Sequence, residues 1–267
     1  MAAPIRHVRF WCTLQKSFNF DVDVVCHIPG VRYLLYPGRC RRKMIRFFSS
    51  TDMGKREYWD TFYAKRNASC DPAFDWFFTH DVANRWLAKC IFAMRTTGPA
   101  NGVVNILELG CGTSTLASNL LKDNVDVMSL VCADFSPRAI RQAQSISRRI
   151  CSSNKESIQF VVADASRLPF RNNHFDVVFE KGTFDAMLNS NNSDLARMSF
   201  SETVRVLNSR GTLLQFSDEN PDLRLSFLEE ALRESGVDRN QASVTFQDVG
   251  SSYGVEYFLY ATKLSKS

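Results

Sequence analysis

The sequence Ile106-Leu107-Glu108-Leu109-Gly110-Cys111-Gly112-Thr113-Ser114 joins an apolar run to a glycine-rich turn. The run over 103–109 predicts a buried strand, and the apolar positions of Leu116, Leu120 and Leu121 predict that a helix follows it. Glycines at 110 and 112 let the backbone turn sharply and approach a ligand that a Cβ would exclude. The stretch therefore predicts a strand, a ligand-binding turn and a helix in succession.

The same alternation of strand and helix continues along the chain. Because strands joined by helical crossovers run parallel and their connections are right-handed, helices are expected on both faces of one sheet. Two later β-rich runs flank Gly250 and Gly254 and predict an antiparallel hairpin at the sheet edge. The expected fold class is α/β, a doubly wound, mostly parallel seven-stranded sheet. The expected strands are 103–109, 128–133, 158–163, 175–179, 212–216, 242–249 and 256–262.

Charge divides the chain unevenly. Residues 1–50 hold nine Lys and Arg against two acids, a net charge of +7, whereas the remainder has 24 basic and 26 acidic residues. An Arg-rich, acid-poor start is typical of a mitochondrial presequence, with a processing site near 46–50; a basic tail is the alternative. We expect a presequence over 1–48, a helical and aromatic cap over 49–100 and the ligand-binding domain over 101–267.

The slightly acidic remainder argues against a nucleic-acid partner, because such enzymes carry basic surface. No run approaches the length of a membrane span, which argues against a membrane partner. Eight cysteines without a Cys-x-x-Cys pair indicate reduced thiols and no metal site. Matrix or cytosol would both agree with this.

The glycine-rich turn suits two different cofactors. A dinucleotide fingerprint requires a third glycine where Thr115 stands, and Glu108 would repel a pyrophosphate. S-adenosylmethionine carries a sulfonium and an ammonium group and no phosphate, so an acid beside it is favourable. The turn therefore favours this methyl donor, although a plain β-to-α turn is the simpler alternative.

Acids also end the next two strands. Asp134 lies 22 residues after Gly112, where a carboxylate accepts both ribose hydroxyl hydrogens of a nucleoside. Asp164, with the backbone N–H of Ala165, is placed to bind an adenine edge. Either acid alone could simply cap a helix. Together with the turn they resemble the class I methyltransferases over residues 103–216, with Ser114 in place of the usual third glycine.

Motifs further along resemble a narrower group. A segment similar to that of the seven-strand protein lysine methyltransferases is Glu180-Lys181-Gly182-Thr183-Phe184-Asp185-Ala186. The sequence motifs typical of enzymes that methylate the amino groups or the cytosine C5 of nucleic-acid bases are absent. Phe74-Asp75-Trp76-Phe77-Phe78 and the run from Gly211 to Asp222 resemble the mitochondrial branch of that group that acts on citrate synthase. This resemblance spans about residues 56–262 and implies S-adenosylmethionine as cofactor, citrate synthase as partner and the matrix as location.

The resemblance also implies site residues. Lys181 and the aromatic residues belong to the implied cofactor pocket, although Tyr63 and Phe74 could equally be core residues. Asp185 or Glu180 could orient the lysine amine, or Asp185 could cap a helix. The expected cofactor-binding residues are Trp59, Tyr63, Phe74, Glu108, Gly110, Gly112, Asp134, Phe135, Asp164, Ala165, Glu180 and Lys181, with Asp185 as the catalytic candidate. Small-molecule methylation, elongation factor 1A as the acceptor, or a non-catalytic assembly factor remain alternatives.

Overall fold

The computed structural model describes residues 24–28, 31–35, 52–67, 73–97, 103–123, 128–151, 158–190, 192–252 and 254–265. Seven strands form one sheet in the order β5-β4-β3-β6-β7-β9-β8. The first five run parallel, whereas β9 is antiparallel to both β7 and β8. The predicted fold class is therefore confirmed, including the hairpin. The strands are β3 (Val104–Leu109), β4 (Met128–Asp134), β5 (Ile158–Val162), β6 (Phe175–Lys181), β7 (Leu207–Ser217), β8 (Ala242–Ser252) and β9 (Val255–Leu264).

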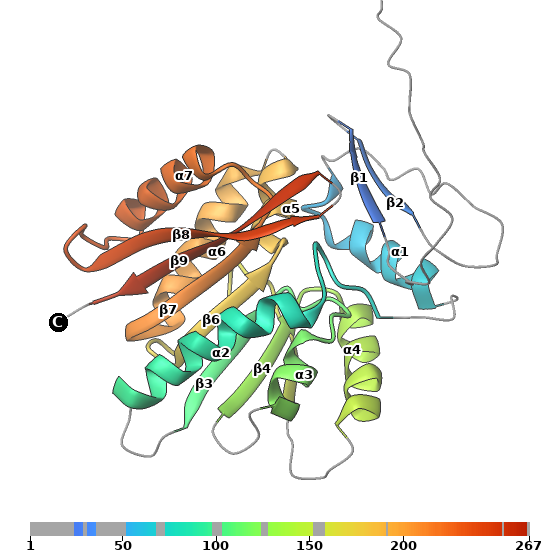
Figure 1. The fold of residues 1–267 in the computed structure, drawn as a ribbon, viewed down its shortest axis with the longest axis horizontal. Helices are drawn as coiled ribbons and strands as arrows, with labels where there is room; N and C mark the ends of the chain where they lie inside the picture. Colours follow the sequence, from blue (N-terminus) through green and yellow to red (C-terminus); the bar gives the residue numbers. More distant parts are fainter. Residues whose placement is uncertain are drawn as a thin grey trace, which may run out of the picture.

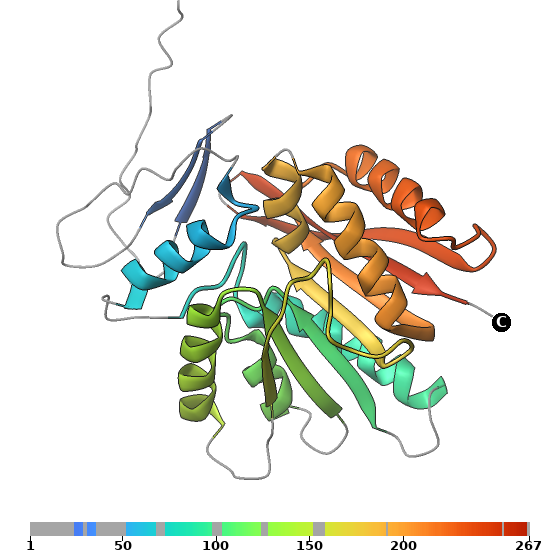
Figure 2. The same ribbon diagram turned by 180° about the vertical axis from the view of Figure 1, so that it is seen from behind.

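Helices cover both faces of the sheet (Figures 1 and 2). Neighbouring strand residues point to opposite faces, so Ile106 joins one buried hydrophobic cluster and Leu107 the other. The first cluster is completed by α2 (His80–Thr97), α3 (Leu116–Asp123) and α4 (Pro137–Ile150). The second is completed by α5 (Thr183–Asn189), α6 (Ser193–Val206) and α7 (Pro221–Glu234). This double layer fixes the carboxyl ends of the parallel strands at one edge.

The N-terminal elements cover that edge in part. Helix α1 (Arg56–Asn67) packs against α4, and residues 73–78 return to the glycine-rich turn. We refer to α1 and residues 73–78 as the cap. Helix α2 lies within the range 49–100 expected to form the cap, but it packs on the sheet, where Leu87 and Ile91 are buried in the same cluster as Ile106 of β3.

Little of the predicted presequence is described. Strands β1 (Val24–Ile28) and β2 (Val31–Leu35) form an antiparallel pair. The predicted processing site at 46–50 lies outside the described residues.

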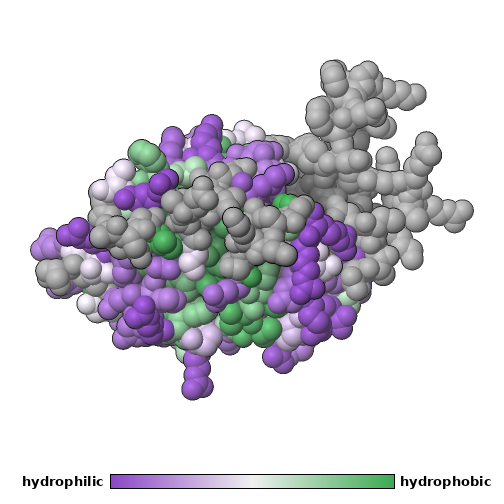
Figure 3. Space-filling view, turned by 90° about the horizontal axis from the view of Figure 1, so that it is seen from below, coloured by the Kyte–Doolittle hydropathy of each residue, from purple (hydrophilic) through white to green (hydrophobic). Residues whose placement is uncertain are grey.

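On the face seen from below, hydrophobic residues lie at the centre with hydrophilic residues on both sides (Figure 3). Among the described helices, none combines the length and apolarity needed to cross a membrane.

Candidate functional site

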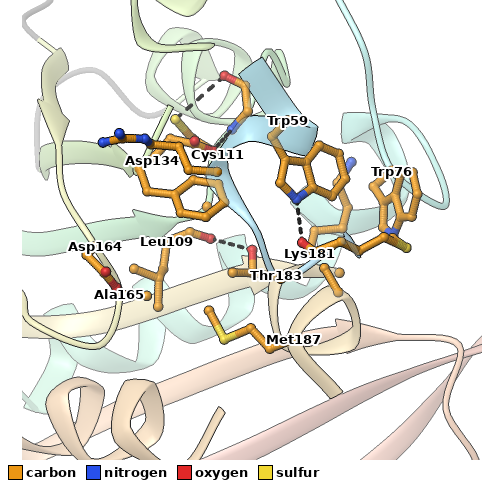
Figure 4. Close-up of a pocket in the computed structure, with 18 of the residues that line it drawn as sticks. Trp59, Trp76, Leu109, Cys111, Asp134, Asp164, Ala165, Lys181, Thr183 and Met187 are labelled. Carbon is orange, nitrogen blue, oxygen red and sulfur yellow. Dashed lines mark hydrogen bonds between the residues drawn. The ribbon is translucent and has the colours of Figure 1, made fainter. Parts of the chain in front are cut away.

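A cavity of about 480 Å³ lies at the carboxyl ends of β3, β4, β5 and β6, beneath the cap (Figure 4). Its volume is in the range of small-molecule sites. Most of the predicted cofactor residues line it. These are Trp59, Tyr63, Phe74, Glu108, Gly110, Gly112, Asp134, Phe135, Asp164, Ala165 and Lys181. The parallel topology thus brings together residues that are up to 122 positions apart in the sequence.

The glycines of the turn are required by its shape. Gly110 and Gly112 have φ values of 68° and 53°, in the left-handed region that favours glycine. A Cβ on Gly112 would lie 2.5 Å from the Tyr63 hydroxyl oxygen, so the cap approaches the turn as closely as a glycine allows. The turn is therefore both bent and covered.

Asp134 is held by the backbone. One carboxylate oxygen accepts the Gly112 N–H at 2.9 Å and the other accepts the Ser136 N–H at 2.8 Å. Burial raises the pKa of Asp134 to about 6 despite these two N–H groups, so the carboxylate is mainly ionised at neutral pH. It keeps lone pairs that can accept hydroxyl hydrogens from a ligand in the cavity.

Glu108 lies deep in the same cavity with 4% of its surface exposed. Burial raises its pKa to about 8, although the positive charge of Lys181 opposes this. A buried acid that is largely protonated in the free protein becomes an anion when a cation binds beside it. This is the electrostatic behaviour expected next to an ammonium or sulfonium group.

Asp164 follows β5 at the other end of the cavity, with Ala165 beside it (Figure 4). One oxygen of Asp164 accepts the N–H and the hydroxyl of Ser166, at 2.9 and 2.7 Å. The other oxygen keeps its lone pairs for a donor such as an adenine amino group.

Asp75 connects the cap to the sheet, a role that the sequence did not reveal. It accepts hydrogen bonds from Ser114 Oγ at 2.6 Å, Thr115 Oγ1 at 3.2 Å and Lys181 Nζ at 2.8 Å. Burial raises the pKa of Asp75, but Lys181 and the hydroxyl donors outweigh it, so the pKa is lowered overall. Ser114, the departure from the usual glycine, thus has a structural use, because its side chain fastens the turn to the cap.

Aromatic rings form the underside of the cap. Trp59 stacks near Tyr63 with ring centres 6.0 Å apart and meets Trp76 edge to face at 6.0 Å. Trp59 Nε1 donates to the Met53 carbonyl at 2.6 Å, which fixes the orientation of the indole. Tyr63 and Phe74 are buried and also line the cavity, so they serve as core and wall at once.

Two predicted acids are not at the cavity. Glu180 is fully buried, and one of its oxygens accepts the Thr183 N–H at 2.7 Å, so it caps the start of α5. Asp185 is 2% exposed and accepts hydrogen bonds from Arg224 Nη2 at 2.8 Å and from Ser217 Oγ at 2.5 Å. The expectations that Glu180 binds the cofactor and that Asp185 orients the amine are therefore corrected. Their side chains point to the packed side of β6 and α5.

Other lining residues were not predicted. Trp76, Thr183 and Met187 line the cavity, and Thr183 Oγ1 donates to the Leu109 carbonyl at 3.0 Å. Thr183 lies in the quoted acceptor segment, so its position was open to prediction. Among the described residues no cluster of His, Cys, Asp and Glu could hold a metal ion.

Comparison with known proteins then supplies the context for this geometry. A sequence family described as a methyltransferase domain matches residues 106–211. The citrate synthase-lysine N-methyltransferase, mitochondrial, of Homo sapiens is 31% identical over 243 residues, which cover 88% of this chain and 94% of that one. The chain belongs to this lysine methyltransferase family.

A second relative aligns with this chain over only part of its length. The eEF1A lysine and N-terminal methyltransferase of Mus musculus is 28% identical over 167 residues, 62% of this chain but only 21% of its own length. As a member of the family, the chain is an S-adenosylmethionine-dependent protein-lysine methyltransferase.

Solved structures show the fold of the family. The N-methyltransferase NodS from Bradyrhizobium japonicum, in complex with S-adenosyl-L-homocysteine, matches with a TM-score of 0.52 at 16% identity, over 78% of this chain and 99% of that one. The [4+2]-cyclase SpnF matches with a TM-score of 0.57 at 17% identity, over 82% and 97%. Since one of these is named for a cyclisation, the shared fold alone does not fix the reaction.

Proposed function

We propose that this enzyme methylates a lysine of citrate synthase in mitochondria. Support comes from the extent of the match with the relative named for that substrate, 94% of whose length aligns. The relative named for elongation factor 1A aligns over 21% of its length. A match along nearly a whole chain includes the surface that meets the acceptor, whereas a match to one domain need not.

The cavity residues fit S-adenosylmethionine. We propose that Asp134 accepts hydrogen bonds from the ribose hydroxyls, that Asp164 and Ala165 contact the adenine, and that Glu108 lies beside the ammonium group. Glycines 110 and 112 admit the ligand close to the backbone. When bound, the cofactor supplies a methyl group on a sulfonium sulfur that departs as a neutral thioether.

The remaining task of the chain is to present a neutral, aligned amine. The cap shields the cavity from water, and desolvation lowers the pKa of an incoming lysine because it disfavours the ammonium form. Alignment of the two reacting groups can lower the activation barrier by about 7–11 kcal/mol in well-oriented systems. Since Glu180 and Asp185 are buried behind the wall, we propose that the amine loses its proton to solvent before it is enclosed.

Direct methylation of citrate synthase tests the proposed substrate. The full chain is incubated with the labelled methyl donor and purified citrate synthase, or with elongation factor 1A as a matched protein acceptor. We expect label only in citrate synthase, and peptide mass spectrometry should place it on one lysine. Asp134→Ala serves as the inactive control, because it lacks the carboxylate proposed to hold the ribose.

Other outcomes identify other functions. Label in elongation factor 1A alone would refute citrate synthase as the substrate. Label only in extractable small molecules would indicate a small-molecule acceptor. Tight binding of S-adenosyl-L-homocysteine without transfer to any acceptor would indicate a non-catalytic factor.

We also propose that residues 1–48 direct the chain to the mitochondrial matrix. The net charge of +7 over residues 1–50 and the mitochondrial label of the human relative support this. A fluorescent protein fused after residue 50 should enter the matrix, and replacing Arg39, Arg41, Arg42 and Arg46 by Gln should reduce its import. Equal import of both fusions would contradict a basic presequence.

A further inference from the structure

A strained turn carries Trp76. Phe77 has a φ of 67°, and the Phe78 N–H donates to the Trp76 carbonyl at 2.8 Å, so residues 76–78 form a tight three-residue turn. Such turns with a positive φ at the central residue are rare, and a bulky side chain there is unfavourable. Within the described residues, Asn173 is the one other non-glycine residue with a positive φ. Strain of this kind persists where the surroundings enforce it, and it is frequent at ligand sites.

Contacts on both sides of Trp76 enforce the turn. Lys181 Nζ donates to the Asp75 carboxylate and to the Phe78 carbonyl, each at 2.8 Å. The Phe77 ring lies 5.5 Å from the ring of Tyr257 on β9. Lys181 thus holds the residue before Trp76 and the second residue after it, and its charge is neutralised by Asp75. The turn is fastened at each end while the indole between is left to face the cavity.

The indole lies against the end of β6. A Cβ on Gly182 would be only 1.9 Å from Trp76 Cδ1, so the ring rests directly on the glycine backbone. Gly182 has a φ of 81° and is the N-cap of α5, whose Thr183 and Met187 line the cavity. The strained turn, the glycine and Lys181 together set one position for this ring.

The position separates Trp76 from the nucleoside end. Asp164 and Ala165 lie at one side of the cavity and Trp76 at the other, with Thr183 between them (Figure 4). Trp59 meets Trp76 edge to face, and Met187 adds an apolar surface below. Asp134 and Asp164, the acids that suit a nucleoside, are thus absent from the end of the cavity where Trp76 and Trp59 meet.

We propose that Trp76, together with Trp59, forms the subsite for the acceptor lysine, an inference that rests on the proposed protein-lysine substrate. The apolar stem of lysine gains from contact with an indole face, and an apolar wall favours the neutral amine that must react. After transfer, the methylated ammonium is stabilised by cation–π attraction, for which Trp is the strongest ring. Lys181 and Gly182 act as positioning residues for Trp76.

Kinetics of Trp76 variants test the subsite. For the full chain, Trp76→Leu should lower kcat/KM for citrate synthase by about tenfold or more, mainly through KM, because the contact between the indole face and the apolar stem of the lysine is lost. Trp76→Phe should fall between Trp76→Leu and the wild type. Calorimetric affinity for S-adenosyl-L-homocysteine should be unchanged in both. Trp86→Leu is the matched control, because Trp86 packs on the α2 side of the sheet and does not line the cavity.

The outcomes decide between this inference and others. Wild-type kcat/KM in Trp76→Leu, or a parallel loss of S-adenosyl-L-homocysteine affinity, would overturn it. If Trp76→Leu does not fold by circular dichroism, Trp76→Phe decides alone, and a KM equal to that of the wild type would overturn the subsite. If the wild type methylates another protein, citrate synthase is wrong and the same variants are measured on that protein. Methylation of small molecules alone would overturn both proposals.

Discussion

Loss of one partner in the buried Asp185–Arg224 pair should destabilise the fold strongly. Both side chains are almost fully buried, at 2% and 1% exposed, and Arg224 Nη2 lies 2.8 Å from Asp185 Oδ1. Removing one member of such a pair leaves the other charge without compensation, which typically costs about 3–5 kcal/mol. For a domain of this size each kcal/mol lowers Tm by about 2–4 °C, so Asp185→Asn or Arg224→Met should lower it by about 6–20 °C.

The double variant distinguishes a charge effect from a packing effect. With Asp185→Leu and Arg224→Met together, no buried charge is left alone, and apolar replacement of a buried pair is often close to neutral. We therefore expect its Tm to lie above that of either single variant. Thermal unfolding followed by circular dichroism measures this, in parallel with kcat determined well below the Tm of each variant.

Measurement of kcat tests whether Asp185 has only a structural role. A residue that only holds α5 in place should leave kcat of the folded enzyme near the wild-type value. Removal of a general base lowers rates by about 10²–10⁴-fold. A wild-type Tm with a loss of that size in Asp185→Asn would refute the buried-pair argument and restore Asp185 as the group that contacts the amine.

Three further predictions concern the cavity. Asp134→Ala should weaken S-adenosyl-L-homocysteine binding by about 10- to 100-fold, since hydrogen bonds to a charged group contribute about 1.5–3 kcal/mol each, and unchanged calorimetric affinity would exclude the ribose contact. Glu108, with a pKa raised to about 8, is mostly protonated at pH 7, so binding of a cation beside it should release a proton and the affinity should rise as the pH approaches 8. Calorimetry in buffers of different ionisation enthalpy counts the protons released, and Glu108→Gln should release fewer than the wild type. Equal release by the two proteins would place the ammonium group elsewhere. Gly182→Ala and Gly236→Ala should both carry a backbone strain of about 1–2 kcal/mol, because each glycine has a positive φ. Gly182→Ala should also lower activity, because its Cβ would displace Trp76, whereas Gly236, with a φ of 71°, has open space around it. Equal activity of the two variants would argue against the contact between Gly182 and Trp76.

The sheet could be predicted because its strands are short runs rich in apolar and β-branched residues that alternate with helices. Strand β7 was the main departure, since it begins at Leu207 and not near Thr212. Leu207 pairs with Phe175, and a register shift then separates this pairing from that of Thr212 with Val177. The polar residues between them read as a loop in the sequence, because an irregular strand has no regular alternation.

The acids of the cavity could be predicted for a topological reason. Parallel strands end at one edge, so an acid that follows each strand must lie near the others. Glu180 could not be distinguished from these cavity acids, because β6 is buried on both faces and the sequence does not show which of its residues point toward the cavity. The partner of Asp185 is Arg224, 39 residues later, and no periodicity connects the two.

Trp76 was beyond reach for a different reason. Its position depends on Phe77 in a left-handed conformation, which a sequence containing Phe does not suggest. The hydrogen bonds that enforce it come from Lys181, more than a hundred residues away. Irregular segments held by long-range contacts are where local patterns carry the least information.

The carbonyl of Met53 that orients Trp59 limits where the proposed presequence could be cut. Met53 is buried, and any protease that trims the N-terminus must therefore cut before this residue to leave an enzyme with its tryptophan in place. A cut a few residues further on would remove this carbonyl, and the Trp59 indole would lose the hydrogen bond that orients it. The sheet begins well after this point, so the position of such a cut would act on the tryptophan at the cavity and not on the fold.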